Sequence, residues 1–238
     1  LRHHEGRVRP AQLFARRGQF VLAQRRAVRR FLALLVRRAE ADVRAAADQR
    51  GLAGFGLRSA DGLRDFDRIV AVDSGNFMGY PAAHLSVPDQ YGFCFTQAFQ
   101  SIGLGLATAI GAAIARPDRL AVAALGDGGA LMSVSELETV TRLGLPMVVV
   151  VYDDEAYGAE VHHFGPDGDP LDVVRFPPAD IAAIGRGFGF EGVTVRDPAD
   201  LAPVRGWLAG PRERPLLIDA KVTSAQGSWW LEEAFRGH

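Results

Sequence analysis

Cysteine and long apolar runs are scarce in this sequence, and each scarcity excludes a class of protein. The single cysteine among 238 residues, Cys94, allows no disulfide within the chain and no Cys-rich zinc or iron-sulfur site. No apolar run reaches the roughly 18 residues that a membrane-spanning helix needs. Charges interrupt every apolar stretch of residues 1–20, unlike in a signal peptide. These absences predict a cytoplasmic protein that does not bind membranes.

The charges are unevenly distributed along the chain. Residues 1–65 hold 15 arginines against 6 acidic residues, whereas the rest of the chain is acidic and contains the only lysine, Lys221. This asymmetry predicts two regions. The first, 1–65, is an Arg-rich segment with a helix over 20–49 and a glycine-rich linker, and the second, 66–238, is a domain. Because no nucleic-acid-binding motif accompanies the arginines and the attached domain is acidic, we expect no nucleic-acid partner.

From residue 66 onward, apolar runs typical of buried strands alternate with helical patterns. This alternation predicts an α/β fold, a three-layer α/β/α unit with a mostly parallel sheet. The expected strands lie at 68–73, 120–125, 147–152, 192–195 and 215–220, and the expected helices at 98–115, 133–143, 179–188 and 198–208. Ser133 and Glu136 have the spacing of a capping box, Gly144 is a natural helix stop, and residues 76–97 resemble a loop.

Two carboxylates stand at the ends of consecutive expected strands. Asp127 follows strand 120–125, and Asp154 follows strand 147–152. Because neighbouring parallel strands end at the same edge of a sheet, we expect these side chains to lie side by side there, where such folds bind ligands. Carboxylate oxygens are the donors that a divalent cation such as Mg²⁺ prefers.

Glycines surround the first of these carboxylates. Gly126, Gly128 and Gly129 let the backbone approach an anion closely, at the start of a helix that favours negative charge. Together with the carboxylates, this loop suits a cation that carries a diphosphate, although an ordinary Asp-Gly turn explains the glycines equally well. The glycines at 103 and 105 suggest a nicotinamide-binding fingerprint, but no strand immediately precedes them, so that motif lacks its context.

The order of these features resembles the diphosphate-binding domain of thiamine diphosphate-dependent enzymes, the superfamily of acetolactate synthase, pyruvate decarboxylase and benzoylformate decarboxylase. Their signature is Gly-Asp-Gly, then a helix and a strand, then an Asn-rich turn. Ile102, before GLGLATAIGAAIA, matches the bulky residue that lies under the cofactor in this family. Gly75, Asn76 and Phe77 match the family's first diphosphate loop. The resemblance covers residues 67–225.

The resemblance implies thiamine diphosphate and Mg²⁺ as cofactors. Asp127, Asp154 and the backbone carbonyl of Ala156 would be the metal ligands. The carbonyl of Gln100 would accept a hydrogen bond from the aminopyrimidine of the cofactor, and Tyr157 would pack beside it.

The activity that the resemblance implies is that of a thiamine diphosphate-dependent lyase or transferase. It would be a 2-oxo acid decarboxylase or an acetolactate synthase-like carboligase, with a small 2-oxo acid as substrate, in a homo- or hetero-oligomer. The family activates its cofactor with a glutamate from a pyrimidine-binding domain, and residues 1–65 are too short and too Arg-rich to be one. We expect that domain to come from another chain or from a missing N-terminal region. A subunit of a two-chain oxidoreductase and a non-catalytic cofactor-binding fragment are the alternatives.

The chain departs from the family's pattern at the second metal turn, where Asp153 and Asp154 replace two asparagines. The added negative charge near Asp127 predicts that, without metal, one carboxylate of the site has a raised pKa. His162 and His163 follow this turn and are the candidate catalytic residues, because imidazoles transfer protons near neutral pH. A solvated pair of loop histidines is the alternative.

Overall fold

The structure, a computed structural model, describes residues 67–95, 101–225, 227–228 and 230–231. These residues belong to one compact unit, Arg58–His238. The Arg-rich segment 1–65 and the cofactor contact expected at Gln100 lie outside the described residues, so both stay predictions.

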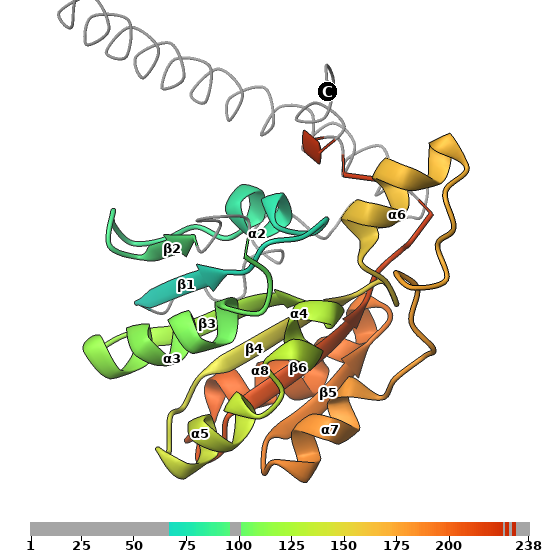
Figure 1. The fold of residues 1–238 in the computed structure, drawn as a ribbon. Helices are drawn as coiled ribbons and strands as arrows, with labels where there is room; N and C mark the ends of the chain where they lie inside the picture. Colours follow the sequence, from blue (N-terminus) through green and yellow to red (C-terminus); the bar gives the residue numbers. More distant parts are fainter. Residues whose placement is uncertain (1–66, 96–100, 226, 229, 232–238) are drawn as a thin grey trace, which may run out of the picture. The chain divides into compact units, whose positions relative to one another are not determined.

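A six-stranded parallel sheet forms the centre of the described domain, in the order β2-β1-β3-β4-β6-β5 (Figure 1). Its strands are β1 (Arg68–Val72), β2 (Phe93–Phe95), β3 (Leu120–Gly126), β4 (Val148–Asp153), β5 (Glu191–Val195) and β6 (Leu216–Lys221). The five expected strands are confirmed, with bounds that shift by no more than one residue. The sixth, β2, lies in the stretch expected to be a loop, because three residues are too few to show a periodic pattern.

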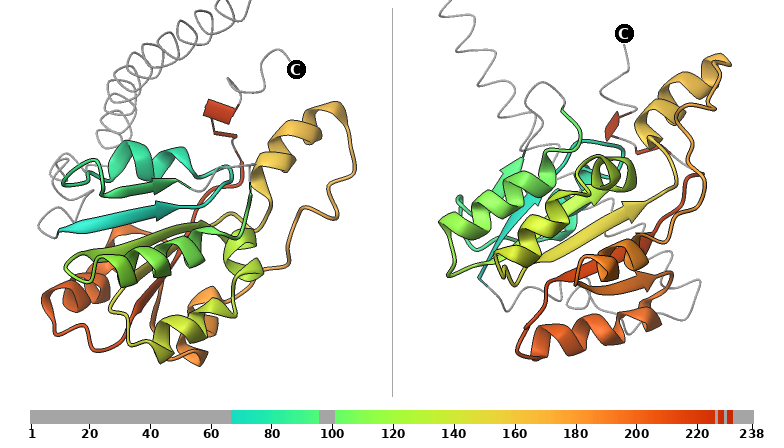
Figure 2. Two further views of the ribbon diagram at one scale, coloured as in Figure 1. Left: turned by 60° about the vertical axis from the view of Figure 1, so that its left-hand side comes forward. Right: turned by 60° about the horizontal axis from the view of Figure 1, so that its bottom comes forward.

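Strand residues alternate between two hydrophobic cores, as the pleat of a strand requires. Every second residue of β3 from Ala121 onward packs in one core and the intervening residues from Leu120 onward pack in the other. The first core is covered by α3 (Gly105–Ala115), α5 (Glu136–Arg142) and α7 (Ile181–Gly187), and the second includes residues of α8 (Ala202–Ala209). Helices thus lie on both faces of the sheet (Figure 2), which confirms the three-layer α/β/α fold.

The region after β3 differs from the expected single helix 133–143. It forms two short helices, α4 (Asp127–Met132) and α5. Ser133 does not cap the second one: its hydroxyl donates to the carbonyl of Gly129 at 2.8 Å, back into α4. Helix α4 starts at Asp127 itself, so the carboxylate of Asp127 lies at a helix N-terminus. Gly144, at φ 63°, ends α5 as expected.

Further short helices occupy segments that the sequence left irregular or assigned to one longer helix: α2 (Gly79–His84), α6 (Gly158–Phe164), and the 3₁₀ helices η2 (Gly165–Asp167) and η3 (Pro198–Leu201). Within the described ranges, no helix is both long and apolar enough to cross a bilayer.

The strand order positions a crevice. β2 lies on one side of β1, whereas β3 and all later strands lie on the other side. The loops that leave the carboxyl ends of β1 and β3 therefore diverge, and in α/β sheets a ligand-binding crevice lies at such a switch point.

Candidate functional site

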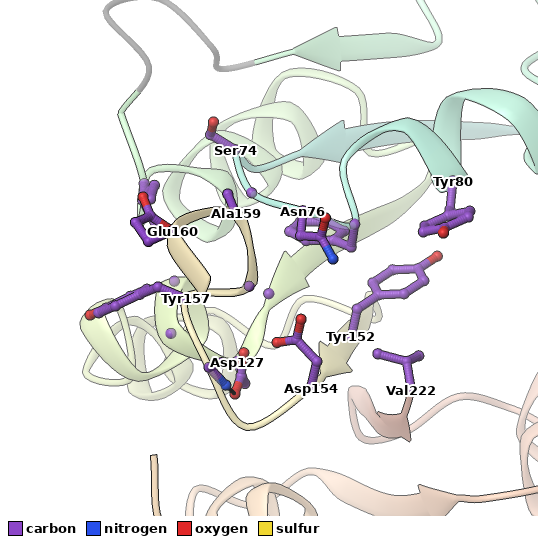
Figure 3. A pocket seen from close by; sticks show the side chains of 18 of the residues that line it. Ser74, Asn76, Tyr80, Asp127, Tyr152, Asp154, Tyr157, Ala159, Glu160 and Val222 are labelled. Atoms are coloured by element: carbon purple, nitrogen blue, oxygen red, sulfur yellow. Dashed lines mark hydrogen bonds between the residues drawn. The ribbon is translucent and has the colours of Figure 1, made fainter. Parts of the chain in front are cut away.

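A cavity of about 410 Å³ opens at this switch point. It is lined by the loop after β1 (74–77), the glycine loop after β3 (126–129) and the turn after β4 (154–160), together with Ile102. Figure 3 shows side chains from these segments facing one space. The structure therefore brings together segments that lie more than 80 residues apart in the sequence, from Ser74 to Glu160.

Asp127 is the first residue of α4 and is 3% exposed. Its Oδ2 accepts a hydrogen bond from the backbone N–H of Ala156, 3.1 Å away, which joins the glycine loop to the turn after β4. Burial, and then the negative charge of Asp154, raise the pKa of Asp127 to about 7. Among the described residues that line the cavity, no cationic side chain is present to keep Asp127 ionised.

Asp154 lines the same cavity. Burial raises its pKa to about 6, against hydrogen bonds to its backbone and to the Asn76 side chain that lower it. The expectation that one carboxylate of the site has a raised pKa is confirmed, and the pKa is in fact raised for both Asp127 and Asp154. The main cause differs from the expected one: loss of solvation outweighs the repulsion between the two carboxylates.

The surroundings of the two carboxylates fit a divalent cation. No Lys, Arg or His is among the described residues that line the cavity. In the part of the chain that the structure describes, no three or more His, Cys, Asp or Glu side chains form a cluster that could hold a metal. Mg²⁺ needs about six oxygens, so two carboxylates would have to be joined by backbone and ligand oxygens. The backbone N–H of Ala156 is held by Asp127, and the ligand role expected of its carbonyl stays a prediction.

Glycine is required in this loop by close packing, because an added side chain would collide with neighbouring residues. A methyl group at Gly128 would collide with the ring of Tyr157, and one at Gly129 would meet the carboxylate of Asp73. Gly75 has φ 143°, in a region that L-residues rarely adopt. Gly126, Gly128 and Gly129 all line the cavity, as expected for a loop that a phosphate approaches closely.

Asn76 links the cavity to the C-terminal part of the chain. Its side-chain oxygen accepts from the N–H of Ser228 at 2.9 Å, and its backbone carbonyl accepts from the Ser228 hydroxyl. The same side chain also contacts Asp154. The sequence motifs point to Asn76 but not to Ser228, because the two lie 152 positions apart.

Aromatic rings flank the cavity. Phe77 is 6% exposed and stacks on Tyr152, with ring centroids 5.0 Å apart. Tyr157 packs edge-to-face against Phe176 at 4.7 Å. Phe77 and Tyr157, the two residues predicted from the sequence, both line the cavity. Each ring is held in place by a neighbouring ring.

The two candidate catalytic histidines do not line the cavity. His162 and His163 lie in the last turn of α6, and the ring of His163 packs on Phe164. Glu160, in the first turn of the same helix, lines the cavity instead, and Figure 3 shows it on the side away from Val222. The elements expected from the sequence include no helix over this stretch. Recognising the helix would have favoured its first turn, which is nearest to Asp154.

Comparison with known proteins identifies, over most of the described chain, the same family that the sequence motifs resemble. The pattern of the family described as "Thiamine pyrophosphate enzyme, C-terminal TPP binding domain" matches residues 73–220. The acetolactate synthase of Bacillus subtilis (strain 168) is 31% identical over 155 residues, which cover 64% of this chain and 27% of that protein. An alpha-keto-acid decarboxylase of Mycobacterium bovis (strain BCG / Pasteur 1173P2) is 37% identical over 108 residues, covering 45% of this chain and 19% of that protein.

A solved structure shares the fold. The thiamine diphosphate-dependent 4-hydroxybenzoylformate decarboxylase of Rhodococcus jostii RHA1 matches with a TM-score of 0.59 at 24% identity, over 70% of this chain and 32% of that chain. At this identity the match supports the architecture alone. The chain spans about a quarter of the length of the synthase and less than a third of the length of the decarboxylase whose structure is known.

Proposed function

We propose, because the chain belongs to the thiamine pyrophosphate enzymes and carries their C-terminal cofactor-binding domain, that it binds thiamine diphosphate together with Mg²⁺. It would do so for a 2-oxo acid decarboxylase or an acetolactate synthase-like carboligase. The observation that carries the proposal is a pair of carboxylates, the buried Asp127 and the half-buried Asp154, beside a glycine loop in a cavity whose described lining has no cationic side chain.

Different residues of the cavity would bind different parts of the cofactor. Asp127, Asp154 and the carbonyl of Ala156 would hold the cation, and the backbone of the glycine loop would receive the phosphates. Ile102, which lines the cavity, would support the ring portion. When bound, thiamine diphosphate supplies the electron sink that a 2-oxo acid needs to lose CO₂.

Glu160 is the candidate for proton transfer. It is the one carboxylate, besides the two proposed metal ligands, among the described residues that line the cavity. A carboxyl group close to a reacting centre can hold or deliver a proton, whereas His162 and His163 would have to act from the far end of α6. We therefore propose Glu160 for this role, and the role predicted for the histidines stays a prediction.

The complete enzyme would need a pyrimidine-binding domain. The matched relatives are much longer than this chain, which supports a partner domain from another chain or from a missing N-terminal region. An oligomer that joins the two domains is part of the proposal, as is a small 2-oxo acid as substrate.

Binding calorimetry tests the cofactor site. We expect the chain to bind thiamine diphosphate only with Mg²⁺, and Asp127→Asn to weaken binding by about tenfold or more. Asp154→Asn should bind at least as well as the unchanged chain, because an amide oxygen is still a metal ligand and one repulsive charge is gone. Asp180→Asn, at the start of α7, is the matched control. Binding that is indifferent to Mg²⁺ would overturn the proposal.

Activity separates the alternatives. The chain would be mixed with candidate pyrimidine-domain subunits, and CO₂ release from pyruvate and benzoylformate measured with and without an artificial electron acceptor. Release without an acceptor supports a decarboxylase or carboligase, and release only with one supports an oxidoreductase. Cofactor binding without CO₂ release under either condition supports a non-catalytic fragment. In an active mixture, Glu160→Gln should lower the rate more than His162→Gln or His163→Gln.

A further inference from the structure

Asp73 is a fully buried carboxylate directly after β1. Its backbone N–H donates to the carbonyl of Ala124 at 2.9 Å, which holds its main chain against β3. Asp73 is not among the described residues that line the cavity. Neither the sequence motifs nor the proposed function gives it a role.

The Asp73 carboxylate accepts hydrogen bonds from the turn before α3. Oδ2 accepts from the N–H of Gly103 at 2.8 Å, and Oδ1 accepts from the N–H of Ser74 at 3.0 Å. The N–H groups of Leu104 and Gly105 also interact with it. Helix α3 has no side-chain cap of its own, since its N-cap residue is Leu104. A carboxylate from the neighbouring strand therefore satisfies N–H groups that the start of a helix leaves unpaired.

Close contacts place this carboxylate between two parts of the cavity wall. A methyl group on Gly105 would lie 2.6 Å from Cβ of Asp73. A methyl group on Gly129 would collide with Oδ2 of Asp73 and lie 3.3 Å from Cγ2 of Ile102. The residue after β1, the turn that carries Ile102 and the last glycine of the loop after β3 thus meet at one side chain.

We infer that Asp73 is a positioning residue, which holds the Ile102 turn against the glycine loop and so sets the ring-binding part of the cavity relative to the diphosphate-binding part. The inference rests on the proposed function, because it assigns these two parts to one cofactor. Asp73 itself touches no cofactor atom in this assignment. Its effect reaches the ligand through the N–H of Gly103 and the adjacent Ile102.

Asp73→Asn tests the inference with two ligands. The amide keeps one acceptor oxygen but turns an NH₂ group toward N–H donors, so the Ile102 turn should be displaced. With Mg²⁺ present, we expect affinity for thiamine diphosphate to fall about tenfold or more, while affinity for inorganic diphosphate stays within about twofold. Equal losses for both ligands, or no loss for either, would overturn the inference.

A double-mutant cycle shows whether the effect passes through Ile102. Ile102→Ala should reproduce the selective loss, and Asp73→Asn should add little to it, because neighbouring residues that act through one contact are not additive. Fully additive losses would contradict the inference. Asp180→Asn is the control, because Asp180 also caps a helix, accepting from the N–H of Ala183 at 2.7 Å, and should change neither affinity.

Two further readouts keep the test decisive. If Asp73→Asn does not fold, hydrogen exchange of the unchanged chain decides. The Gly103 amide should then be as protected as amides of β3, and rapid exchange there would refute the contact. If the unchanged chain binds inorganic diphosphate and thiamine diphosphate no better with Mg²⁺ than without it, the proposed function fails and this inference fails with it.

Discussion

Lys221 neutralises two buried carboxylates near the turn after β4, and its removal should be costly. It ends β6, and its ammonium group forms ion pairs with Asp153 and with Asp219, whose Oδ2 lies 3.2 Å away. It also donates to the carbonyl of Ala179 at 3.1 Å. Asp153 is 3% exposed and Asp219 is fully buried. The only lysine of the chain therefore compensates two charges.

Lys221→Met retains most of the side-chain volume but removes the positive charge. Breaking a buried ion pair by removing one partner costs about 3–5 kcal/mol, because the other charge stays buried without compensation. The Lys221 side chain is 18% exposed, so water can partly replace it and we expect about 3 kcal/mol of lost unfolding free energy. Asp153 also accepts from the N–H of Glu155 at 3.1 Å, so Mg²⁺-dependent cofactor binding should weaken as well.

The loss of unfolding free energy caused by Lys221→Met should depend on pH. Burial raises the pKa of Asp219 even though Lys221 opposes this rise. Without the ammonium group that pKa rises further, and the protonated carboxyl needs no counter-ion. A raised pKa in the folded state means that stability is retained at acidic pH and lost as the pH rises. The variant should therefore lose most at pH 8 and clearly less at pH 5.

Urea unfolding of both proteins at the two pH values measures this. Arg142→Met is the matched control, because Arg142 pairs with Glu138 at 2.9 Å on an exposed helix face, where a pair contributes about 0.5 kcal/mol or less. A loss below about 1 kcal/mol for Lys221→Met at pH 8, or an equal loss at both pH values, would refute the reasoning.

Three further predictions concern the cavity. Because ionised Asp127 is needed to hold a cation and its pKa is about 7 without it, Mg²⁺-dependent binding of thiamine diphosphate should strengthen by roughly two orders of magnitude from pH 5 to pH 8 and release protons. Calorimetry in two buffers would show this, and a flat profile would contradict it. The raised pKa values of Asp127 and Asp154 also mean that the metal-free domain loses stability as the pH rises from about 4 to 7. Gly128→Ala should weaken cofactor binding about tenfold or more, because the new methyl group meets the ring of Tyr157. Gly187→Ala is the control, because a methyl group there meets nothing within 4 Å. Equal cofactor affinities of the two variants would disprove the steric argument.

Much of the fold could be predicted because it is encoded locally. Apolar runs such as 120–125 have the length and composition of buried strands, and alternating helical patterns imply a parallel sheet. The predictions that were wrong concern short or mixed segments. Ser133 and Glu136 have the spacing of a capping box, but Ser133 bonds to Gly129 instead, because the helix that precedes it begins at Asp127. The three residues of β2 were likewise too few to be recognised.

The sequence by itself determined that Asp127 and Asp154 lie at one edge of the sheet, where both line one cavity, because each follows a buried strand and parallel strands end at one edge of a sheet. Only the tertiary structure decided which groups surround them. Gly103 donates to Asp73 across 30 positions, Lys221 pairs with Asp153 across 68, and Ser228 bonds to Asn76 across 152. Residue patterns report the period and burial of one segment. Contacts between segments depend instead on strand order and on how loops leave the sheet, and these are set by packing of the whole domain.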